Sequence, residues 1–124
     1  MSLELKSKPA SRQQVRNSGI YLFQWRRSHG LNRATFAGLA NFSERTLATY
    51  EKRQQLPVFI RPQVNEAVRL VQALQEIIPI EKLPEWLRTP NPGFGGRKPW
   101  TLIRNGERDV IWKMIHQTRQ GSFA

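Results

Sequence analysis

The residue types that most often carry catalysis or bind metals are sparse in this chain. It has 124 residues, no cysteine and two histidines, His29 and His116, which are 87 positions apart (116 − 29). Without cysteine there is no thiolate nucleophile, disulfide or thiolate zinc site, and two distant histidines predict no metal cluster. No pair of carboxylates stands in an apolar setting, and neither histidine has an evident nucleophile beside it. The sequence therefore predicts a protein that is not an enzyme and uses no metal or cofactor.

The glycine-rich residues 93–96 raise the question of a phosphate-binding loop. Such a loop ends in Gly-Lys-Ser or Gly-Lys-Thr and follows a strand, and the sequence offers neither feature here. Gly95 and Gly96 instead permit positive φ angles, so that the chain can reverse before a helix that begins at Pro99. The phosphate-loop interpretation is therefore rejected.

The charge of the chain favours a polyanionic partner, nucleic acid before a membrane. Lys and Arg number 20 against 9 Asp and Glu, which gives a net charge of +11. Residues 1–57 carry ten basic and three acidic side chains (+7), and residues 58–124 carry ten and six (+4). No apolar run approaches the roughly 18 residues of a membrane helix, and residues 1–16 lack the apolar core of a signal peptide. We expect a cytoplasmic protein.

Capping residues and apolar spacing predict an all-α fold. Ser18, Asn32 and Ser43 are each placed to cap a helix, and Gly30 and Asn41 are placed to end one. No segment has the alternation of a strand. The predicted helices cover residues 18–28, 32–41, 43–53, 64–78, 81–87, 99–103 and 107–118.

The segments outside these caps differ in character. Residues 1–17 are basic without apolar periodicity, which predicts a flexible basic arm that could contact phosphates. Residues 58–80 hold the clearest amphipathic pattern of the chain, at 64–78. Its broad apolar stripe predicts either a core helix or a surface that packs against a second copy of the chain.

Residues 30–57 read GLNRATFAGLANFSERTLATYEKRQQLP. Together with the preceding helix they resemble the helix-turn-helix of lambda-repressor-like and Cro-like regulators of the Xre family. The resemblance implies a DNA-binding domain over 18–57 whose third helix enters the major groove. It also implies an ion pair between Arg26 and Glu51. The implied DNA contacts are Glu44, Arg45 and Thr49 at base edges, Ser43 at the start of that helix, and Arg33, Lys52, Arg53 and Gln54 at phosphates.

Residues 86–121 read WLRTPNPGFGGRKPWTLIRNGERDVIWKMIHQTRQG. The Trp-Leu, Thr-Pro-Asn-Pro and Gly-Gly-Arg elements resemble the toxin-binding domain of the MbcA/ParS/Xre antitoxins. The resemblance implies a small helical toxin-binding domain over 81–124. Tryptophan and arginine are common interface anchors, and the candidate toxin contacts are Asn91, Arg97, Trp100, Arg104 and Arg119.

Together the two resemblances imply an antitoxin of a type II toxin–antitoxin module. Such a protein would occlude the active site of a cognate toxin, of the NAD-degrading RES kind or an ADP-ribosyltransferase-like one. It would also repress its own operon as a dimer on operator DNA, with the 64–78 helix as the candidate interface. Two alternatives stay open: a stand-alone repressor whose C-terminal region only dimerises, and an antitoxin whose helix-turn-helix no longer binds DNA.

Overall fold

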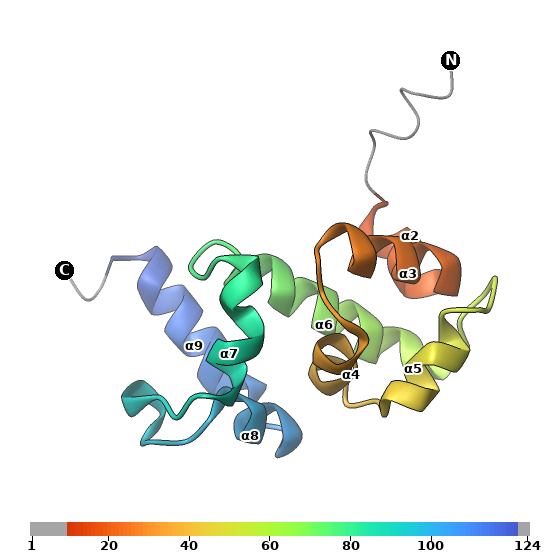
Figure 1. The fold of residues 1–124 in the computed structure, drawn as a ribbon. Helices are drawn as coiled ribbons and strands as arrows, with labels where there is room; N and C mark the ends of the chain where they lie inside the picture. The colour runs from red at the N-terminus through yellow and green to blue at the C-terminus, as the bar shows by residue number, and fades with distance from the viewer. Residues whose placement is uncertain (1–9, 122–124) are drawn as a thin grey trace.

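The computed structural model describes residues 10–121, and its fold is all-α, which confirms the predicted fold class. Across these residues the only extended pairing is an isolated bridge between Asn91 and Arg97. Figure 1 shows the N-terminal helices on one side, α7–α9 on the other, and α6 running between them. The helices are α2 (Arg12–Asn17), α3 (Gly19–Ser28), α4 (Arg33–Ala40), α5 (Glu44–Tyr50), α6 (Arg61–Leu74), α7 (Leu83–Arg88), α8 (Pro99–Arg104) and α9 (Arg108–Arg119), with single 3-10 turns η1 (Val58–Ile60), η2 (Ile80–Lys82) and η3 (Pro92–Phe94).

The predicted caps set the limits of α3, α4 and α5. The side chains of Ser18, Asn32 and Ser43 each accept a backbone N–H from the first turn of the helix that follows. Asn41 adopts the left-handed conformation (φ 60°) between α4 and α5, which an asparagine tolerates. The helix α5 ends at Tyr50, three residues before the predicted end. The chain turns there, and Arg53 donates its N–H to the Tyr50 carbonyl.

The predicted flexible arm over residues 1–17 is wrong for residues 12–17, which form α2. Ser11 and Gln14 form a reciprocal capping box at its start. Val15 is fully buried, and α2 packs against α3 and α6. The buried Val15, the cap and a hydrogen bond from the Leu56 amide to the Asn17 carbonyl at 2.8 Å together hold this short basic helix on the core. Residues 1–9 lie outside the described residues.

The helix α6 is the centre of the core, and its apolar stripe is used within the chain. Its buried side chains pack against α2, α4 and α9. The helix begins at Arg61, earlier than predicted, because Pro62 fits the first turn of a helix. The interpretation of 64–78 as a dimer interface is therefore corrected: its apolar face is already covered. The buried residues of α6 are Val64, Ala67, Val68, Leu70, Val71, Ala73 and Leu74.

The two halves of the chain share one continuous hydrophobic core. The N-terminal part contributes residues such as Phe36 and Leu47, and the C-terminal part contributes Leu102 and Ile111. Direct packing of α4 against α8 closes this core. In the part of the chain that the structure describes, no helix is both long and apolar enough to cross a bilayer.

Candidate functional site

The exposed face of α5 carries the side chains predicted to reach base edges. Glu44, Arg45 and Thr49 are exposed, whereas Leu47 on the opposite face is fully buried. The Thr49 hydroxyl donates to the Arg45 carbonyl at 3.1 Å, so its hydrogen is used within the helix and its oxygen can still accept a hydrogen bond. Ser43 is occupied in capping, with its Oγ 3.0 Å from the Thr46 amide. The helix thus presents one cation, one anion and one hydroxyl.

The predicted phosphate contacts lie at two places beside α5. Lys52, Arg53 and Gln54 are exposed in the turn that follows the helix. Arg33 stands in the first turn of α4, and its guanidinium lies 3.2 Å from Oε1 of Glu51. Because its side chain remains 41 % exposed, Arg33 is held in place while part of it stays open to a ligand.

A buried ion pair joins α3 to the end of α5. Arg26 donates from Nε to Oε2 of Glu51 at 2.6 Å and from Nη2 to Oε1 at 3.0 Å. A third donor, Nη1, reaches the Leu31 carbonyl at 2.9 Å. The two side chains are 5 % and 2 % exposed. A bidentate pair of this kind fixes the relative orientation of its two side chains. It therefore holds α3 against the end of α5, and the bond to Leu31 also holds the loop before α4. These are the two residues that the helix-turn-helix resemblance pairs.

Gly19 is a structural residue that the sequence reasoning missed. A Cβ at this position would lie closer than 3.0 Å to the carbonyl oxygens of Tyr50 and Arg53. The start of α3 therefore touches the backbone at the C-terminal end of α5 and just after it, and only a glycine allows that approach. Its place directly after a capping serine gives no local signal of this contact, since the partner is about 30 residues away.

Replacing Gly19 by Ala lowers the free energy of unfolding by about 1–3 kcal/mol, the usual cost of overpacking. The direction of the change is informative, because alanine is a better helix former than glycine. At a position without the close backbone contact, the same substitution would raise the free energy of unfolding. Urea denaturation followed by circular dichroism measures the change. Gln24→Ala on the exposed side of α3 is the control, expected within about 0.5 kcal/mol of the parent. Equal stability of the two variants would contradict the close contact.

The loop before α8 is fixed by its own hydrogen bonds. The Asn91 amide donates to the Arg97 carbonyl at 3.1 Å, and Oδ1 of Asn91 accepts from the Gly93 amide at 2.8 Å. Gly95 and Gly96 have positive φ angles of 66° and 81°, which the sequence predicted for a chain reversal. The loop is therefore exposed and already ordered. It loses little conformational entropy when a partner binds it.

The five candidate toxin contacts do not form one cluster. Arg97 pairs with Glu107 at 3.0 Å, and Arg119 pairs with Glu76 at 3.0 Å. Both pairs are exposed, so they hold these side chains only weakly. Arg119 lies at the far end of α9, about 17 Å along the helix axis from its start beside α8. Arg104 is exposed and makes no ion pair within residues 10–121.

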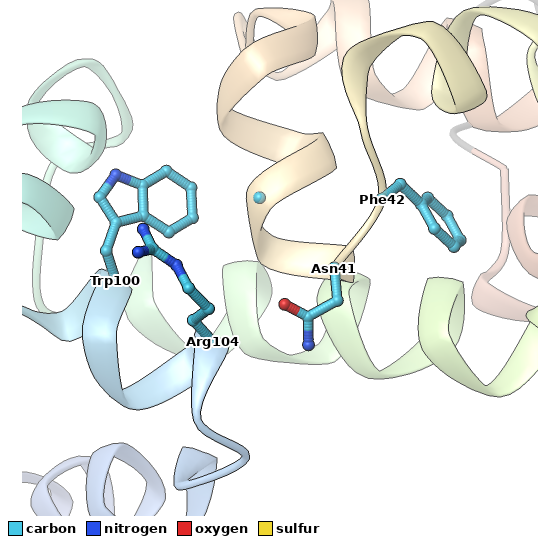
Figure 2. Close-up of a pocket in the computed structure, with 5 residues that line it drawn as sticks. Asn41, Phe42, Trp100 and Arg104 are labelled. Atoms are coloured by element: carbon cyan, nitrogen blue, oxygen red, sulfur yellow. The ribbon is translucent and has the colours of Figure 1, made fainter.

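Trp100 points from α8 towards α4 of the other half of the chain. The backbone of Gly38 is covered by the Trp100 ring so closely that a Cβ there would come within 3.0 Å of ring carbons. Beside this contact is a pocket of about 370 Å³ lined by Gly38, Asn41, Phe42, Trp100 and Arg104. Figure 2 shows Trp100 and Arg104 projecting from α8 beside the end of α4, with Asn41 facing Arg104 across the gap.

Arg108 is a second residue that the sequence reasoning missed. From the start of α9 its Nη2 donates to the Leu39 carbonyl in the last turn of α4. Burial lowers the pKa of Arg108, and the negative charge of Glu66 opposes that shift. Its buried Nε has no hydrogen-bond partner in the described structure. No group of three potential metal-ligating side chains occurs in residues 10–121.

Comparison with known proteins places a family domain on the C-terminal half. Residues 73–110 match the family model of the antitoxin Xre/MbcA/ParS C-terminal toxin-binding domain. The matched segment includes Asn91, Arg97, Trp100 and Arg104, whereas Arg119 falls outside it.

The chain is also similar to curated proteins over most of its length. It is 27% identical over 95 residues to the mycobacterial cidal antitoxin MbcA of Mycobacterium bovis and to that of Mycobacterium tuberculosis. The aligned region covers 76% of this chain and 84% of each relative. The search of solved structures found no significant match.

Proposed function

We propose that this chain, a member of the Xre/MbcA/ParS antitoxin family by its residues 73–110, binds a cognate toxin with its C-terminal half and neutralises it. The match of that segment to a toxin-binding domain is the observation that carries the proposal. The similarity to antitoxins over 95 residues adds support, because the aligned region extends well beyond the matched domain. An antitoxin acts by binding, so the function needs no catalytic residue.

The toxin we propose is an NAD-degrading enzyme of the RES kind, whose active site the antitoxin occludes. The preformed loop of residues 89–97 favours an occluding role, because a stiff and exposed segment can enter a cavity at low entropic cost. An ADP-ribosyltransferase-like toxin is the other candidate. Both enzymes act on NAD, so an assay of NAD consumption by the bound enzyme applies to either.

Co-expression with the product of the adjacent open reading frame tests the antitoxin function. We expect the two proteins to co-purify, and we expect growth and cellular NAD to be restored relative to cells that express the neighbour alone. An Arg97→Ala variant should weaken the complex, and Arg88→Ala, which removes an exposed arginine on α7, is the charge-matched control. An active neighbour that neither binds this chain nor loses toxicity would contradict the proposal and favour a stand-alone repressor.

The N-terminal half, we further propose, binds operator DNA and represses the module. The exposed face of α5 and the cations beside it support this role, because a helix held on a rigid scaffold can present base-reading side chains to the major groove. The excess of +7 in residues 1–57 would attract DNA in a salt-dependent way.

Operator binding by a dimer completes the proposal, since one such unit reads few base pairs alone. The apolar face of α6 is not the surface that would join two copies, because it is buried within the chain. Val58 and Phe59, directly before α6, are 72 % and 76 % exposed. They are the most exposed of the large apolar side chains in the described residues.

A further inference from the structure

The end of α4 is held by three side chains from outside the helix-turn-helix. The Trp100 ring of α8 covers Gly38, and Arg108 of α9 donates to the Leu39 carbonyl. Gln63 of α6 donates from Nε2 to the Ala40 carbonyl at 3.0 Å. The last carbonyls of a helix lack partners within it, so these donors satisfy groups that the helix-turn-helix leaves open. Three consecutive residues of α4 thus each have a contact from the later part of the chain.

This end of α4 leads directly into the recognition helix. Only Asn41, Phe42 and Ser43 separate Ala40 from the first residue of α5. Asn41 is in the left-handed conformation, and Ser43 caps α5, so the connection is short and fixed. A displacement of the end of α4 therefore passes to α5. The ion pair of Arg26 and Glu51 restrains the other end of α5, which leaves its first turn, with Glu44 and Arg45, governed by the α4 contact.

We propose that Trp100 is a positioning residue for operator binding: it acts through Gly38 on the orientation of α4 and α5, although it lies in the toxin-binding segment. This inference rests on the proposed operator binding. Trp100 is then not a toxin contact. Its packing against Gly38 forms a joint between the two halves of the chain. A toxin that displaces α8 would then lower operator affinity, and by linkage operator DNA would lower the affinity for that toxin by the same factor.

The joint can be perturbed from either side without removing the core. Trp100 is half-buried, and the pocket of about 370 Å³ beside it gives the ring room to move. A methyl group at Gly38 would displace the ring, and removal of the ring would leave α4 uncovered. Gly38→Ala and Trp100→Ala therefore disturb one contact in opposite ways, and the double variant removes the clash. This is the design of a double-mutant cycle.

The experiment measures the Kd of each variant for the operator and for an unrelated duplex at a fixed salt concentration. Each variant is made in the full chain and is measured below its own melting temperature. We expect Gly38→Ala and Trp100→Ala each to weaken operator binding about tenfold. The double variant should lose no more than Trp100→Ala alone. Binding to the unrelated duplex should change little, because no basic side chain is removed.

Trp112→Ala is the matched control for loss of a tryptophan. Trp112 is also half-buried, and its ring lies 5.1 Å from the Arg69 guanidinium of α6. We expect it to lower the melting temperature as Trp100→Ala does and to leave operator Kd unchanged. Unchanged operator Kd for a folded Trp100→Ala would overturn the inference and leave the proposed function standing. A parent chain that prefers the operator no more than the unrelated duplex would overturn the proposed operator binding and this inference with it.

Discussion

Replacing Glu51 by Gln lowers the free energy of unfolding by about 3–5 kcal/mol, a large share of the 5–15 kcal/mol typical of a domain. The substitution keeps the shape of the side chain and removes its charge. The Arg26 guanidinium, with its side chain 5 % exposed, is then left buried without an anion, and Arg33 loses its ion pair with Glu51. Urea denaturation followed by circular dichroism measures the loss.

Two controls separate this buried pair from an ordinary surface contact. Glu76→Gln breaks the exposed pair with Arg119 and should cost no more than about 1 kcal/mol. The double variant Arg26→Met with Glu51→Leu removes both charges, and we expect it to regain much of the lost stability. A Glu51→Gln variant as stable as Glu76→Gln would show that the buried charge is not the dominant contribution.

The parts of the fold that the sequence predicts are those set by local chemistry. Ser18, Asn32 and Ser43 cap their helices because each side chain needs only the backbone N–H three residues onward. Asn41 marks the turn because its own backbone can adopt positive φ. Such features are decided within a few residues, so spacing alone identifies them.

The short helix α2 could have been found from the same kind of signal. Ser11 followed three residues later by Gln14 is a capping-box pattern. The single apolar residue Val15 gives no periodicity, however, and the basic composition of residues 1–17 favoured an extended arm. Tertiary burial of Val15 decided the outcome, and burial is not visible in a stretch with one apolar side chain.

The contacts that join the two halves could not be predicted from the sequence. Gly38 and Trp100 are 62 positions apart (100 − 38), and neither has a neighbour that signals the other. The stripe of α6 shows that one face must be buried but not what covers it; here α2, α4 and α9 do. Periodicity therefore favoured a core helix and left a dimer interface open as the alternative, and only the packing separates them.

Replacing Arg45 by Ala should remove most of the sequence preference of operator binding while leaving the toxin complex intact. Arg45 is exposed on α5 and makes no ion pair within residues 10–121, so its guanidinium is free to donate two hydrogen bonds to the O6 and N7 acceptors of a guanine. A good bidentate contact contributes about 1–3 kcal/mol of discrimination between bases. The ratio of Kd values for operator and unrelated duplex measures the loss. Toxin co-purification should persist because Arg45 lies outside residues 73–110.

Lys113→Ala distinguishes base reading from general charge. Lys113 is exposed on α9, and its removal changes the net charge by the same single unit as Arg45→Ala. If Arg45 only held a phosphate, its loss would weaken operator and unrelated duplex alike and reduce the salt slope by about one. Base reading predicts instead that Arg45→Ala weakens the operator selectively and that Lys113→Ala weakens neither duplex strongly. The two outcomes therefore show whether Arg45 of α5 reads a base or only adds electrostatic affinity for any duplex. The net charge of +11 cannot distinguish these two roles.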